Sequence, residues 1–176
     1  MLAAGAALWT FRSGYGELRR TWSWFAVSAG VAVFVMWIGL EPPLPDLGRR
    51  ADLRAGLEAM PALAAGAWLM FRVIGAVVAV PLAEELAFRG YVCRRAVSAE
   101  VASVPFGRFS WWGLLVSSLL FGLLHQRLLA GTLAGLVYGL AVSRRGELGD
   151  AVVAHAVTNG GLAGWVLGTG SWELWG

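Results

Sequence analysis

Residues 22–40 read WSWFAVSAGVAVFVMWIGL, an unbroken run of 19 residues without a charged side chain. As an α-helix this run would be about 28 Å long at ~1.5 Å per residue, which matches a hydrocarbon core of roughly 30 Å. It is too long for the apolar region of a signal peptide, and no small-residue cleavage site follows it. The run therefore predicts a membrane-spanning helix.

The rest of the sequence repeats this pattern. The chain has 176 residues and is 58% hydrophobic and only 14% charged, whereas about a quarter of the residues in soluble domains are charged. Further apolar segments cover residues 59–97, 110–125, 129–143 and 150–169. The first of these is too long for one span, so we expect a tilt, kink or break near Pro81. We predict an all-α, polytopic transmembrane bundle of about 5–6 helices.

Two further features bound the organisation of the chain. Residues 1–11 are apolar but too short to span a membrane. The arginines fall in short clusters between apolar runs, as in membrane-flanking loops, and form no stripe for nucleic acid. We divide the chain into an N-terminal segment with the first transmembrane helix and a loop (1–58) and a core (59–176).

Small residues form two stripes in the last two apolar segments. Glycines recur every four residues, at Gly131, Gly135 and Gly139 and at Gly160, Gly164 and Gly168. This spacing lets helix backbones approach closely in lipid. We predict that both stripes are packing seams between helices.

The stretch PLAEELAFRGYV, residues 81–92, places ionisable groups inside an apolar helix. Such groups are costly in a membrane and therefore suggest function. Glu85 and Arg89 are four residues apart, so they share a helical face and can form an ion pair. Glu84 is rotated by about 100°, so we expect it to face another way and to be free to act. In the alternative, both acids belong to a buried ion-pair network that serves packing.

Both histidines of the chain lie in later apolar segments, and Asn159 shares a helical face with His155. With a free carboxylate, His125, His155 and Asn159 would supply a base, a water-holding imidazole and a polarising pair around a polar intramembrane cavity. The same carboxylate and imidazoles could instead bind a divalent metal such as zinc. Since His125 ends one span and His155 begins another, they can meet only if residues 125–132 form a short buried turn or the helices tilt strongly.

The three patterns E-E-x-x-x-R, F-x-x-x-H and H-x-x-x-N occur in this order on successive apolar segments. Together they resemble the CPBP family, the CAAX protease and bacteriocin-processing membrane endopeptidases, over about residues 70–170. The stretches LLAGTLAGLVYGLA and TGSWELW are also similar to members associated with exosortase systems.

The resemblance implies a role for each matching residue. Glu84 would be the general base that activates water, and His125 would help to hold that water. His155 and Asn159 would stabilise the oxyanion. In a metalloprotease reading, Glu84, His125 and His155 would bind the metal. Supporting roles fall to Glu85, Arg89 and Phe121.

The resemblance implies an intramembrane endopeptidase of the bacterial cytoplasmic membrane that hydrolyses a membrane-associated peptide or protein. An exosortase-type sorting system would be a partner, and nucleic acid would not. The alternative is a non-catalytic peptide-binding or immunity protein that uses the same cavity. A proton-coupled transporter is a third reading, although no inverted repeat is visible. The H-E-x-x-H pattern of other metalloproteases is absent from the chain.

Overall fold

The computed structural model of the chain describes residues 22–40, 53–125 and 127–175. The short apolar stretch 1–11 and most of the loop after the first span lie outside these ranges. The described elements are helices and turns, without a strand, so the predicted all-α class is confirmed. The separate helices are α2 (Trp24–Leu40), α3 (Leu53–Glu58), α7 (Trp111–Leu124), α8 (Leu128–Arg145) and α9 (Leu148–Thr169), with 3₁₀ turns at Val101–Ser103 and Trp172–Trp175.

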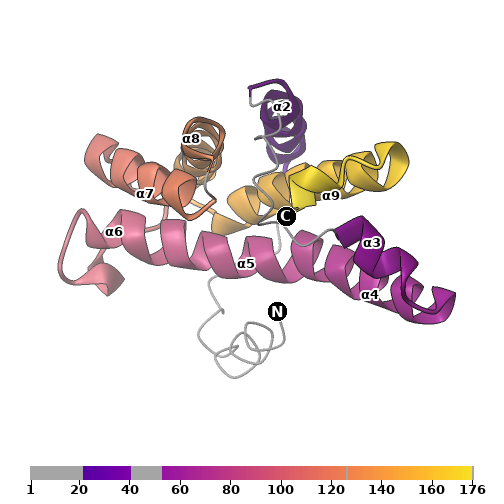
Figure 1. Cartoon of the computed structure of the whole chain (residues 1–176). Helices are drawn as coiled ribbons and strands as arrows, with labels where there is room; N and C mark the ends of the chain where they lie inside the picture. Colours follow the sequence, from indigo (N-terminus) through magenta and orange to yellow (C-terminus); the bar gives the residue numbers. More distant parts are fainter. Residues whose placement is uncertain (1–21, 41–52, 126, 176) are drawn as a thin grey trace.

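A continuous helix of 34 residues, Ala62–Arg95, runs across one side of the bundle (Figure 1). It is made of α4 (Ala62–Ile74), a π-helical segment η2 (Gly75–Ala79), α5 (Val80–Glu85), a second π-helical segment η3 (Leu86–Val92) and α6 (Cys93–Arg95). The chain does not break at Pro81, which lacks an N–H for the helical ladder, because a wide π-helical segment ends at Ala79, two residues before the proline.

The first glycine stripe is a packing seam between α7 and α8, as predicted. A Cβ atom at Gly131 would lie 2.7 Å from the Cα atom of Gly122, and one at Gly135 would lie 2.8 Å from the Cα atom of Ser118. A Cβ atom at Gly139 would collide with the side chain of Leu114. Only glycine permits this approach of the two backbones.

The prediction for the second stripe is wrong. A Cβ atom added at Gly160, Gly164 or Gly168 would meet no atom of the described residues within 4 Å. The helix α9 instead approaches α2 through Gly30, where a Cβ atom would lie 2.7 Å from Cβ of Val157. A four-residue repeat defines a face of a helix, but it does not say whether a neighbour covers that face.

Helix α2 packs into the same bundle as the later helices. Its small residues Ala26, Ala29 and Val33 are buried in a core shared with Ala134 of α8 and Ala154 of α9. The first predicted span therefore helps to enclose the region in which the candidate site lies.

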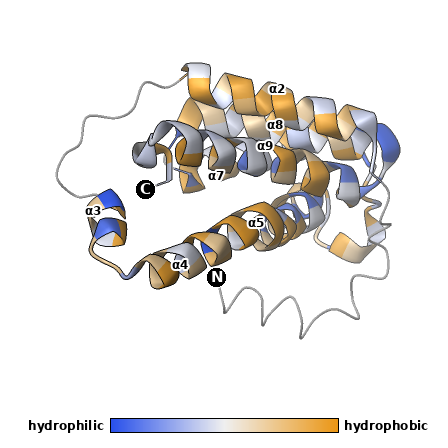
Figure 2. Ribbon diagram, turned by 90° about the vertical axis from the view of Figure 1, so that its right-hand side faces the viewer, coloured by the Kyte–Doolittle hydropathy of each residue, from blue (hydrophilic) through white to orange (hydrophobic). Residues whose placement is uncertain are grey.

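The outer surface is suited to lipid. Figure 2 shows hydrophobic residues along much of α2, α4 and α5, and a group of hydrophilic residues at α3. Two helices of the described residues, Ala62–Arg95 and Leu148–Thr169, are long and apolar enough to cross a membrane, while Trp24–Leu40 and Trp111–Leu124 are shorter apolar helices. The chain folds as a polytopic transmembrane helical bundle.

Candidate active site

The paired acids lie at the end of α5, between the two π-helical segments. Glu85 is completely buried, and Arg89 is 2% exposed. Nε of Arg89 lies 3.2 Å from Oε2 of Glu85, although the two atoms are not aligned for a hydrogen bond, and Nη1 donates to Oε1 at 3.3 Å. Nη2 of Arg89 donates to the carbonyl of Gly135 at 2.7 Å. The predicted pairing of Glu85 with Arg89 is confirmed, and it ties the long helix to α8.

His155, in α9, contacts both carboxylates. Its Nδ1 atom lies 3.0 Å from Oε1 of Glu85, and its Nε2 atom lies 4.0 Å from Oε2 of Glu84. The two acids face different ways, as expected, but both contact the same imidazole. A rotation of about 100° between neighbouring residues brings them to the two nitrogens of one imidazole, because the ring lies between them. A carboxylate can only accept, so Nδ1 of His155 carries a hydrogen.

His125 forms the C-cap of α7, so its imidazole approaches Glu84 from α7, whereas that of His155 approaches from α9. Its Nδ1 atom lies 2.8 Å from the carbonyl oxygen of Phe121, which can only accept, so Nδ1 carries the hydrogen. Nε2 of neutral His125 is then an acceptor, and it lies 3.5 Å from Oε2 of Glu84. That carboxylate oxygen is buried and accepts no hydrogen bond from the described residues. The ring of Phe121 supports the imidazole at a centroid distance of 4.2 Å.

A tight connection lets the two histidines meet. Helix α7 ends at Leu124 and α8 begins at Leu128, so the turn at His125 is shorter than the expected turn 125–132, of which residues 128–132 are helical. His155 is about two turns into α9, which begins at Leu148. Both imidazoles reach Glu84 because the long helix passes beside the end of α7 and beside the second turn of α9.

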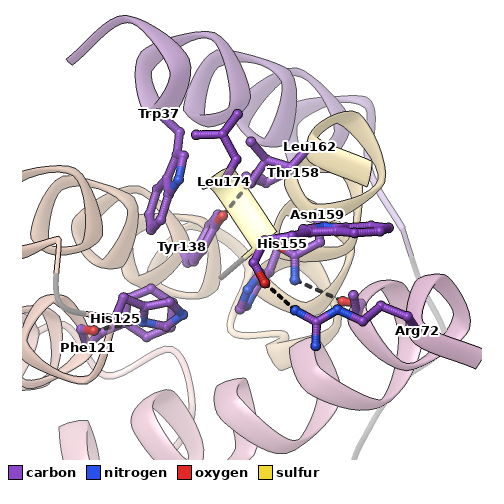
Figure 3. Close-up of a pocket in the computed structure, with 12 residues that line it drawn as sticks. Trp37, Arg72, Phe121, His125, Tyr138, His155, Thr158, Asn159, Leu162 and Leu174 are labelled. Atoms are coloured by element: carbon purple, nitrogen blue, oxygen red, sulfur yellow. Dashed lines mark hydrogen bonds between the residues drawn. The ribbon is translucent and has the colours of Figure 1, made fainter. Parts of the chain in front are cut away.

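Asn159 lies one turn after His155, and both side chains line one cavity (Figure 3). Its Nδ2 atom donates to the carbonyl of Ala76, in the first π-helical segment, at 2.8 Å. An amide nitrogen has two hydrogens, so this bond fixes the side chain and leaves one N–H for another acceptor.

A cavity of about 230 Å³ adjoins these groups. The following residues line it: Trp37, Arg72, Ala76, Phe121, His125, Tyr138, His155, Thr158, Asn159, Leu162, Leu174 and Trp175. The predicted polar cavity is thus present, with Asn159 and both histidines in its wall. Glu84 reaches the same imidazoles from the long helix.

Sequence reasoning missed Tyr138, which stacks on His155, and Thr158, which accepts a hydrogen bond from Tyr138. The ring of Tyr138 stacks on the imidazole with centroids 4.9 Å apart and an angle of 15°. Its hydroxyl donates to Oγ1 of Thr158 at 2.9 Å. Thr158 in turn lies within hydrogen-bond distance of the carbonyls of Gly30 and Ala154. Thr158 could have been found from its position three residues after His155, on the same helical face. For Tyr138 the sequence offers no such signal.

The predicted metal site is the remaining feature of the candidate active site. Among the described residues, no group of three or more His, Cys, Asp or Glu side chains is arranged to hold a metal ion. The predicted divalent metal at Glu84, His125 and His155 therefore stays a prediction, and we derive no step through it.

The fold and these contacts define a helical membrane protein with a buried cluster of carboxylates and imidazoles at a cavity. Residues 66–161, more than half of the chain, match the family described as Type II CAAX prenyl endopeptidase Rce1-like. The chain belongs to this family. Comparisons with curated proteins and with solved structures found no match. Family membership confirms the resemblance to CAAX proteases and supports a CAAX-type intramembrane endopeptidase in general, whereas the association with exosortase systems stays a prediction.

Proposed function

We propose that the chain hydrolyses a peptide bond of a membrane-associated peptide or protein with a water molecule activated by Glu84. The observation that carries this proposal is that two imidazoles converge on Oε2 of Glu84. This oxygen lies 3.5 Å from Nε2 of His125 and 4.0 Å from Nε2 of His155. These groups come from three different helical segments, and the carboxylate oxygen has no donor among the described residues.

The donor and acceptor roles support a particular arrangement of the water. Oε2 of Glu84 and Nε2 of His125 are both acceptors, and a single water beside them can donate one hydrogen to each. Its lone pairs then point away from both groups, toward a substrate carbonyl. Glu84 takes a proton as the oxygen attacks, which makes it the general base, and it gives that proton to the leaving amine as the C–N bond breaks.

The negative charge that develops on the carbonyl oxygen needs donors. His155 already gives its Nδ1 hydrogen to Glu85, so donation from Nε2 requires the imidazolium form. The remaining N–H of Asn159 supplies a second donor. Preorganised donors of this kind are worth several kcal/mol in a transition state.

The substrate class follows from the family. Its description names CAAX prenyl endopeptidases, so peptides with a prenylated cysteine near the C-terminus are the first substrates to test. We place the reaction in a bacterial cytoplasmic membrane, where secreted peptides or a sorting-system protein are further candidates.

The experiment compares the Glu84→Gln variant with the original chain, both reconstituted in lipid vesicles with prenylated and unprenylated peptides. We expect Glu84→Gln to abolish cleavage, because glutamine cannot accept the proton, while peptide binding persists. The matched control is Glu58→Gln, which removes an exposed carboxylate in an ion pair with Arg54 and should leave cleavage unchanged. Equal cleavage by Glu84→Gln would refute the general-base role, and binding without cleavage by the original chain would favour the non-catalytic alternative.

A further inference from the structure

Arg72 is a charged residue that the proposed hydrolysis does not use. It lies in α4, within the apolar helix Ala62–Arg95, and its half-buried side chain lines the cavity near Asn159 (Figure 3). A charged group inside an apolar membrane helix is costly unless a partner compensates it. The nature of that partner is therefore informative.

The contacts of Arg72 include no carboxylate from the described side chains. Its Nη2 atom donates to the backbone carbonyl of Trp175, and its guanidinium lies 5.7 Å from the centre of the Trp68 ring and 5.6 Å from that of Trp175. A guanidinium has five N–H donors and binds carboxylates through two parallel hydrogen bonds. Among the described residues, Arg72 meets one neutral carbonyl and two aromatic rings, which leaves most of its N–H donors available for a further acceptor.

A peptide segment already lies against Arg72. The turn Trp172–Trp175 follows α9, and Trp175 packs in a cluster with Ala163 and Val166 of α9 and with Leu69 and Val73 of α4. The space between α4 and α9 thus accepts a peptide backbone with an acceptor oxygen directed at the guanidinium.

The position of Arg72 on the long helix limits its distance from the reacting bond. Arg72 and Glu84 are twelve residues apart on one continuous helix, which corresponds to about 18 Å at ~1.5 Å per residue. An extended peptide advances about 3.3 Å per residue. A group bound at Arg72 therefore lies within about five residues of a peptide bond held at Glu84.

We propose that Arg72 binds a carboxylate of the peptide substrate, within about five residues of the hydrolysed bond, in the place now taken by the carbonyl of Trp175. This proposal rests on the proposed function, because it assigns part of the same cavity to substrate recognition. An Arg–carboxylate pair is charge-assisted, and it is stronger than the present bond to a neutral carbonyl. The carboxylate can come from a free C-terminus or from an Asp or Glu side chain.

The test measures peptide binding to the Glu84→Gln variant of the full chain in detergent. The probes are fluorescein-labelled peptides of Ala, Val and Leu, made in matched pairs. In the first pair, one peptide ends in a carboxylate and the other in a carboxamide. In the second pair, both peptides end in a carboxamide, and one has an internal Asp where the other has Asn. Because a hydrogen-bonded ion pair is lost, we expect the neutral member of at least one pair to bind roughly ten- to hundredfold more weakly.

Variants of Arg72 then assign the effect to this side chain. Adding Arg72→Gln should abolish the preference, whereas Arg72→Lys should keep part of it, since lysine keeps the charge but not the two-pronged geometry. Arg54→Gln, which removes an arginine that is 67% exposed, is the control and should keep the full preference. If Arg72→Gln does not fold, the peptide pairs and Arg72→Lys decide.

The outcomes separate this proposal from the hydrolysis. A preference in the first pair assigns the carboxylate to a C-terminus, and one in the second pair assigns it to a side chain. Equal binding within both pairs, or no binding by any peptide, overturns the role of Arg72. Cleavage by the original chain with equal KM in each pair also overturns it but leaves the hydrolysis standing. Carboxylate-dependent binding without cleavage contradicts the hydrolysis alone.

Discussion

Oε1 of Glu85 lies 3.0 Å from Nδ1 of His155, a contact between residues 70 positions apart in the sequence. Both side chains are almost completely buried. The contact joins the long helix to α9, and it directs Nδ1 of His155 to Glu85 and leaves Nε2 facing Glu84. A residue that sequence reasoning treated as support for a helix thus orients a group of the candidate active site.

The substitution Glu85→Gln should destabilise the fold. It leaves the buried guanidinium of Arg89 without its carboxylate, and breaking a buried ion pair costs about 3–5 kcal/mol. We expect a clear fall in Tm, measured by thermal unfolding in detergent, and a lower kcat because a neutral amide oxygen is a weaker acceptor that orients His155 less firmly.

Glu84→Gln should have the opposite profile. Because Oε2 of Glu84 accepts no hydrogen bond from the described residues, replacing the carboxylate should change Tm little while cleavage is lost. If Glu84→Gln and Glu85→Gln lowered Tm equally, the division into an acting and a supporting acid would be wrong.

Two substitutions at Tyr138 test its support of His155. Tyr138→Phe keeps the ring that stacks on the imidazole and removes only the hydroxyl bonded to Thr158, so it should cost about 1 kcal/mol and leave kcat nearly unchanged. Tyr138→Ala removes the ring and should cost about 3–5 kcal/mol. We also expect Tyr138→Ala to lower kcat, in cleavage assays run below the Tm of both variants. Equal kcat for the two would contradict a positioning role.

Alanine substitutions distinguish the two glycine stripes. A Cβ atom at Gly135 would press on Ser118 and lie 3.1 Å from Nη2 of Arg89, so Gly135→Ala should destabilise the chain by about 1–3 kcal/mol, as overpacking does. Gly164→Ala meets open space and should stabilise the helix by up to about 1 kcal/mol. Thermal unfolding of both variants checks this, and a fall in Tm for Gly164→Ala would mean that another molecule covers that stripe.

Asn159→Ala tests the second donor proposed for the oxyanion. Loss of one such donor lowers kcat by about a hundred- to thousandfold in other hydrolases, and we expect a similar loss here with little change in KM. The variant also loses the bond to Ala76, so Tm is measured in parallel. A rise in KM with unchanged kcat would assign Asn159 to binding instead of catalysis.

The parts of the site that sequence reasoning predicted follow from local geometry. Glu85 and Arg89 are one turn apart, as are His155 and Asn159, so their shared faces were predictable from helical periodicity. The ring of Tyr138 against His155 was not predictable, because it depends on how α8 lies against α9. The two glycine stripes have the same spacing, yet only Gly131, Gly135 and Gly139 contact a neighbouring helix.

The sequence by itself determined the helical membrane class, the approximate helices and the order of the acidic, histidine and asparagine patterns. These depend on apolar length and residue spacing, which are properties of each segment alone. Only the tertiary structure decided that Glu84 and Glu85 meet the two nitrogens of one imidazole, and that Arg72 contacts the turn Trp172–Trp175. Such contacts depend on the crossing of helices, because periodicity specifies the face on which a side chain lies and not the partner that lies opposite it.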